Sequence, residues 1–136
     1  MKGLQESFAE LRKLILRKFA TVRFTTVQTP EQFLVEVRAI GRERLPGVLV
    51  VYDGTTIADG VREDQVTLVL VDRFRADSDD RALSVLEATE NLLSLFPADG
   101  QDLGGVWTFP RDCQIASPDR DFAALALGVS MRQSNG

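Results

Sequence analysis

Histidine is absent from this chain, and cysteine occurs once, at Cys113. The absence of histidine excludes Ser-His and Cys-His catalytic pairs and removes the commonest metal-ligating side chain. A single cysteine cannot form an internal disulfide, and it cannot by itself complete a structural zinc site. We therefore expect Cys113 to be an ordinary strand residue. No sequence motif predicts an enzyme or a bound cofactor.

Long apolar runs are also missing. No stretch approaches the roughly 20 apolar residues that a bilayer-spanning helix needs. Charged residues occur throughout the N-terminal segment from Lys2 onward, so it lacks the apolar centre of a signal peptide. The sequence predicts a protein that neither contacts a membrane nor leaves the cell by the standard secretory route, and the lone cysteine agrees with a reducing cytoplasm.

Positive charge is scarce overall and unevenly placed. The formal net charge is −4, which argues against a protein built to neutralise phosphates, so we expect no sequence-specific nucleic-acid partner. Residues 1–44 hold nine Lys/Arg against five Asp/Glu, whereas residues 45–136 hold seven against fifteen. One interpretation is a solvated basic helix beside acidic loops. The other is a molecule with a positive and a negative face, suited to contacts between copies.

Length and composition predict one folded domain. The chain has 136 residues, of which 44% are hydrophobic and 26% charged, as is typical of a globular protein. We expect a single domain over residues 1–136, with residues 132–136 as a frayed tail. Apolar periodicity predicts helices over about 3–20, 30–41 and 83–96. Runs of β-forming residues predict strands at 22–28, 48–52, 65–75, 113–117 and 122–131.

Helices that are separated by pairs of strands favour an α+β fold. We expect a mostly antiparallel sheet of four or five strands, with two long helices and one short helix packed mainly on one face. Thr29 and Pro30 are suited to cap and begin the short helix. The polar stretch from Asp53 to Asp64 contains Asp53-Gly54 and Asp59-Gly60, which predict a loop or a wide hairpin connection.

Carboxylates cluster at one strand-to-helix junction, at Asp72, Asp77, Asp79 and Asp80. Oxygen ligands of this kind suit Mg²⁺ and Ca²⁺, so a weak divalent-cation site, or a metal-dependent enzyme built on it, is one hypothesis. Helix capping and solvation are the interpretation that we favour, because acidic residues at the start of a helix accept backbone N–H hydrogen bonds.

The order of these elements carries a family resemblance. A basic amphipathic helix precedes the strand LPGVLVVYDG, and a long apolar strand runs into a helix, VTLVLVDRFRADSDDRALSVLEATENLLSLF, before two closing strands. Over most of residues 3–132, this pattern resembles the tail-completion and tail-terminator proteins of long-tailed bacteriophages, especially the uncharacterised tail-region family of Mu-like prophages. The resemblance implies an antiparallel sheet flanked by helices. It also implies rings, often hexameric, that cap the tail tube and meet head-completion proteins, and it brings no catalytic residues.

We therefore expect a structural, non-enzymatic protein that self-associates. It would act in the bacterial cytoplasm during assembly and then in a virion tail or a prophage-derived particle. Its candidate contact residues are Asp53, Gly54, Asp59, Gly60, Arg62 and Trp107. The alternative is a monomeric adaptor or small-ligand-binding module with a pocket under residues 97–110. Trp107 is the one aromatic residue that we consider for a partner contact, although a place in the core is the interpretation that we favour for it.

Overall fold

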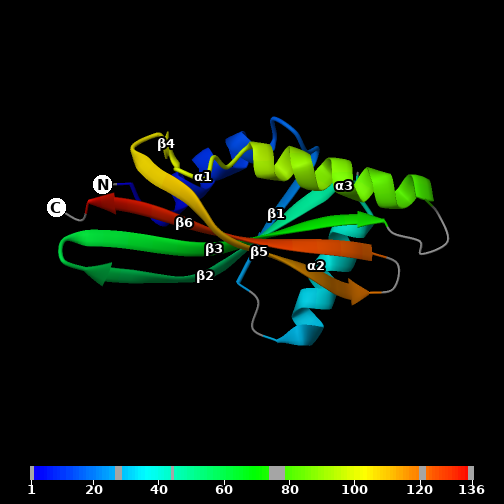
Figure 1. Cartoon of the computed structure of the whole chain (residues 1–136). Coiled ribbons are helices and arrows are strands. Elements are labelled where there is room, and N and C mark those ends of the chain that lie inside the picture. Colours follow the sequence, from blue (N-terminus) through cyan, green and yellow to red (C-terminus); the bar gives the residue numbers. More distant parts are fainter. Residues whose placement is uncertain (1, 27–28, 44, 74–78, 120–121, 135–136) are drawn as a thin grey trace.

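The computed structural model describes every residue except 1, 27–28, 44, 74–78, 120–121 and 135–136 (Figure 1). For residues 73, 79–85, 115–119 and 122–124 it describes the backbone alone. The described elements are α1 (Leu4–Ile15), β1 (Thr21–Thr25), α2 (Pro30–Gly41), β2 (Gly47–Ala58), β3 (Val61–Arg73), α3 (Asp79–Ser94), β4 (Gln101–Leu103), β5 (Val106–Asp119) and β6 (Phe122–Ser134).

The strands form a single curled sheet in the order β1-β2-β3-β6-β5-β4. β1 and β2 are parallel, and every other neighbouring pair is antiparallel. The predicted α+β class and mostly antiparallel sheet are confirmed, but the sheet has six described strands instead of four or five. The additional strand is β4, a three-residue strand that pairs with residues 106–108, where the sequence showed only a Gly-rich segment.

Helices cover both faces of the sheet. α1 and α3 pack on one face over a core that includes Leu11, Leu68 and Leu92. α2 packs on the opposite face, where Val37 and Ile40 meet Leu49 and two valines of β3. The sequence predicted that the helices would pack mainly on one face and that the helix over 30–41 would be the short one. α2 has the same length as α1, 12 residues. It has a face to itself because residues 48–50 of β2 are buried on both sides of the sheet.

Local signals explain where the first two helices begin and end. Thr29 caps α2 as expected, because its hydroxyl oxygen accepts the backbone N–H of Gln32 at 3.2 Å and Pro30 occupies the first turn. α1 ends at Ile15 rather than near residue 20. The N–H groups of Arg17 and Lys18 bond to the carbonyls three residues back, which tightens the chain into a turn before the buried Phe19.

Two strands are longer than the sequence predicted. β5 extends over fourteen residues instead of the predicted 113–117. β6 continues to Ser134, so residues 132–134 are paired with β3 and are not part of a frayed tail. Arg132 pairs with both Glu63 and Trp107 across the sheet, and Gln133 is buried. Polar residues can continue a strand in this way because its neighbours supply hydrogen bonds and ion pairs.

Candidate interaction surface

The predicted loop between Asp53 and Asp64 is instead a long β-hairpin, which we call the arm (Figure 1). β2 runs to Ala58 and β3 resumes at Val61, so the connection is the two-residue turn Asp59-Gly60. Both turn residues have positive φ, 54° and 74°, as a tight hairpin turn requires. Gly54, at φ 138°, lies in a bulge that shifts the register after Tyr52. The polar residues had suggested a loop, but one face of the arm has no helix over it and tolerates them.

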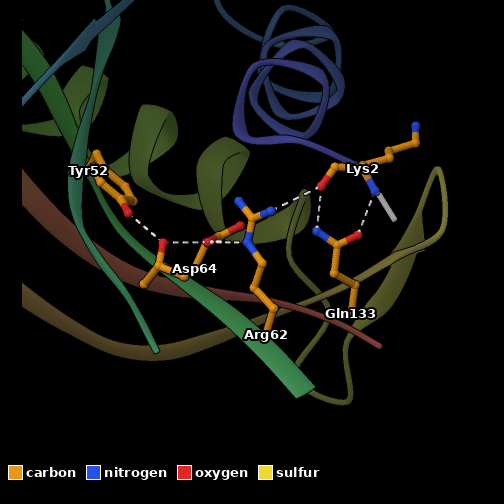
Figure 2. Close-up of polar contacts among 6 residues, drawn as sticks. Lys2, Tyr52, Arg62, Asp64 and Gln133 are labelled. Atoms are coloured by element: carbon orange, nitrogen blue, oxygen red, sulfur yellow. Dashed lines mark hydrogen bonds and ion pairs between the residues drawn. The ribbon is translucent and has the colours of Figure 1, made fainter. Parts of the chain in front are cut away.

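A buried polar network on the helix side holds the arm in place (Figure 2). The Asp64 carboxylate is fully buried, and its Oδ1 accepts hydrogen bonds from Arg62 Nε at 3.1 Å and from the Thr55 hydroxyl at 2.6 Å. Because Thr55 uses its proton on Asp64, the Tyr52 hydroxyl donates to Thr55. The network therefore joins β2 to β3 through side chains as well as backbone.

The same network reaches the start of the chain. Arg62 Nη1 donates to the backbone oxygen of Lys2 at 3.2 Å. The Gln133 side chain also accepts the Lys2 N–H at 3.0 Å and donates to the Lys2 oxygen at 2.9 Å (Figure 2). These hydrogen bonds join the arm to the residues before α1 and to the end of β6. The arm is therefore supported by contacts with other parts of the chain.

The other face of the arm carries a ladder of polar side chains. Thr67 donates to Asp53 at 2.6 Å, Arg132 pairs with Glu63 at 2.8 Å, and Arg132 also lies 5.2 Å from the ring centre of Phe109. Among the elements that the structure describes, α2 alone packs on this face, and its contacts lie with Leu49 and the far half of β3. The ladder is therefore open to solvent or to a partner.

A second exposed surface lies at the β4 edge of the sheet; we call it the acidic edge, made of Asp99, Asp102 and Trp107. The Trp107 side chain is 46% exposed, and both carboxylates belong to exposed residues. Gly100, at φ +89°, makes room for the indole, because a Cβ built there would lie 2.6 Å from Trp107 Nε1. An exposed tryptophan between acidic residues is the feature expected of a partner contact.

Gly100→Ala should displace the indole and cost stability. We expect the free energy of unfolding to fall by about 1–3 kcal/mol because of the strained backbone. We also expect Trp107 fluorescence to change, because the new methyl would clash with the ring. Gly105→Ala is the control: its φ is +94°, but nothing lies within 4 Å of its Cβ. Urea unfolding and emission spectra would test this, and equal emission changes in both variants would contradict it.

A third surface is the α1–β1 groove, an apolar hollow beside the other edge of the sheet, lined by Phe8, Arg12, Lys13, Leu16 and Phe24. A connected hollow of about 630 Å³ continues it toward Tyr52 and Val50. Phe8 stacks on Phe24 with 5.8 Å between ring centres, and the Arg12 guanidinium lies 4.7 Å above the Phe24 ring. Phe8 is half-buried and packs against the core as well as lining the groove. Leu16, one residue past the helix end, is 47% exposed.

The six candidate contact residues are dispersed over the sheet. Asp53 and Trp107 lie on its open face, Gly54 forms the bulge, and Asp59 and Gly60 form the turn at the tip of the arm. The Arg62 side chain points to the opposite face, where its guanidinium donates hydrogen bonds to the Asp64 carboxylate and to the backbone oxygen of Lys2. Its role in the described structure is to hold the arm in place.

Chemistry at the other candidate positions is limited. Partial burial raises the pKa of the Cys113 thiol, and the negative charge of Asp112 raises this pKa by a smaller amount. Both effects disfavour a reactive thiolate at neutral pH. Asp72 is buried, whereas Asp77 and the side chains of Asp79 and Asp80 lie outside the described residues. Within the part of the chain that is described, no group of three His, Cys, Asp or Glu residues could hold a metal ion.

Comparison with known proteins adds no relative. No protein-family model matches the chain, and no curated protein matches it. Across the described helices, none is long and apolar enough to cross a bilayer. The arm, the acidic edge and the α1–β1 groove are therefore the features that bear on function.

Proposed function

We propose that this chain is a structural subunit of a phage or prophage tail that self-associates into a ring, as a tail terminator or completion protein. It would assemble in the bacterial cytoplasm, bind the end of the tail tube or the head–tail junction, and remain in the finished particle. Support comes from the order of its elements, which resembles that of such proteins, and from its three exposed surfaces.

The supported arm is the single observation that carries this proposal. Its tip exposes Ile57, at 63%, and Val61, and one of its faces displays paired charges with no helix over them. Exposed apolar side chains on a rigid element are typical of interaction sites rather than of solvated loops. A strand pair that extends in this way would give an assembling subunit a contact surface.

The mass of the protein in solution tests self-association. Light scattering across protein concentration, with and without Mg²⁺, should show a closed oligomer whose mass reaches a plateau, a hexamer being the size that the resemblance implies. A monomer that stays monomeric when mixed with purified tail tubes would overturn the proposal.

The role in tails is tested in the host. Inactivating the gene in the bacterium that carries it should yield tails of irregular length or tails without heads, as seen by electron microscopy. A plasmid copy should restore uniform particles. Normal particles from the inactivated strain would contradict the tail assignment, whatever the protein's oligomeric state.

The α1–β1 groove favours a second candidate function, a monomeric module that binds an apolar small ligand. Its volume lies within the range of ligand pockets, and its walls are aromatic. The groove lies beside β1 rather than under residues 97–110, where the sequence had placed a pocket. Saturable binding of an apolar fluorescent probe by a strict monomer would favour this function.

A further inference from the structure

The α1–β1 groove has apolar walls and a positive rim. The described residues that line its first part include two charged ones, Arg12 and Lys13, and both are cations. Leu16 extends the apolar surface to the exposed end of α1. Aromatic and aliphatic side chains line this hollow, so it can receive an apolar side chain of a partner. Its rim selects a partner that combines an apolar side chain with negative charge.

The acidic edge has the complementary composition. Trp107 provides the apolar side chain, and its rigid ring loses little entropy when it is buried. Asp99 and Asp102 provide negative charge on the same short segment, in the turn before β4 and in β4 itself. β4 is the last strand in the sheet order, so this edge faces outward.

The two surfaces lie at opposite ends of the same sheet. The groove borders β1, the first strand in the order, and the acidic edge borders β4, the last. Four strands lie between β1 and β4 in the sheet order. Trp107 follows Val106, which is buried in the core under α1, so its side chain lies on the face opposite to the one that α1 covers. Between copies they would form a head-to-tail contact, in which two different patches pair and a suitable rotation closes a ring. The uneven charge along the sequence agrees with this, because the groove lies in the basic part and the edge in the acidic part.

We infer that the acidic edge of one copy docks into the α1–β1 groove of the next. Trp107 enters the hollow between Phe8 and Leu16, and Asp99 and Asp102 face Arg12 and Lys13. This inference rests on the proposed self-association and names the contact that produces it. The arm is left free for the tube or for other partners.

Trp107 is the only tryptophan in the chain, so its fluorescence reports directly on this contact. Mass and emission are measured together on the unmodified full-length protein over a range of concentrations. As the mass rises, Trp107 emission should shift to shorter wavelength and become protected from acrylamide quenching. An oligomer in which emission and quenching match those of the monomer overturns the inferred contact.

Substitution in the groove gives the matched test. Leu16→Glu removes an apolar contact and places a negative charge opposite Asp99 and Asp102 of the docked copy, at an already exposed position, so folding should be unaffected. We expect the dissociation constant between subunits to increase at least tenfold. Leu86→Glu on α3 is the control, because Leu86 is 61% exposed and does not line the groove or the acidic edge. Equal effects of the two substitutions would contradict the contact.

A charge exchange tests the pairing itself. Lys13→Glu should weaken association at least tenfold and Asp99→Lys should do the same, whereas the double variant should recover most of the loss. Lys13 also lies 3.6 Å from Glu10 of its own chain, so Lys13→Met serves as the control for loss of that pair alone. Circular dichroism would confirm that each variant is folded. Failure of the double variant to recover would rule out this pairing.

Different results would contradict the inferred contact and the tail proposal. A closed oligomer that is insensitive to Leu16→Glu, with unchanged emission, overturns the inferred contact and leaves the tail proposal in place. A strict monomer at every concentration overturns the contact as well. In that case the gene-inactivation experiment decides the tail proposal independently, since it does not depend on how the subunits meet.

Discussion

Arg62→Met should lower the free energy of unfolding by about 3–5 kcal/mol. The substitution leaves the fully buried Asp64 carboxylate without its cation, and an uncompensated buried charge is strongly destabilising. It also removes a hydrogen bond to the Lys2 oxygen. Urea unfolding at neutral pH, followed by circular dichroism, would measure the loss.

Two further variants show whether burial is the cause. Arg132→Met breaks an ion pair of similar length on the open face, and should cost no more than about 1 kcal/mol because solvent screens that pair. The double variant Arg62→Met with Asp64→Leu should recover most of the stability, since an apolar pair of similar size can replace a buried ion pair. A single Arg62→Met variant as stable as the wild type would show that Asp64 does not depend on this pair.

Leu68→Ala should destabilise the protein by about 3–5 kcal/mol. Leu68 is fully buried near the middle of β3, under the face that α1 and α3 cover. β3 is hydrogen-bonded on both sides, to β2 and to β6, so the backbone cannot move inward to fill the space. The missing methyl groups would leave a cavity.

Leu86→Ala is the matched control, because Leu86 is largely exposed and its truncation should change stability by less than about 0.5 kcal/mol. Urea midpoints and slopes would be compared for both variants. A loss below about 1 kcal/mol for Leu68→Ala would mean that the helices settle onto the sheet and remove the cavity.

The apolar pattern of the sequence was enough to predict the fold class. The helix over 30–41 was predicted to the residue, because Thr29, Pro30 and the apolar stripe are local signals. The central strand β3 followed from the mostly apolar, β-forming residues between 65 and 75. Features of this kind depend on neighbours in sequence, so the sequence alone reveals them.

The arm, the β4–β5 hairpin and the end of β6 could not be predicted in the same way. Polar residues and glycines interrupt their apolar pattern, and what makes them strands is pairing with partners far along the chain, such as Glu63 with Arg132. For the same reason Arg62 looked like an exposed contact residue. Its side chain is buried because it hydrogen-bonds to Asp64, which lies two residues later on the same face, and to Lys2, which is sixty residues away. The groove was missed because Phe8 and Phe24 come from separate elements and meet only in the fold.

The position of β6 has a consequence for how the protein is made. β6 is the last strand in sequence, yet it lies in the middle of the sheet and is the sole link between β3 and β5 among the described strands. Until the ribosome has released β6, the chain holds two separate strand groups with open edges, and the arm lacks Arg132 and Gln133. Folding should therefore be late and all-or-none, with slow pairing of distant strands as the limiting step. Unfinished chains would then lack the surfaces needed to join other subunits.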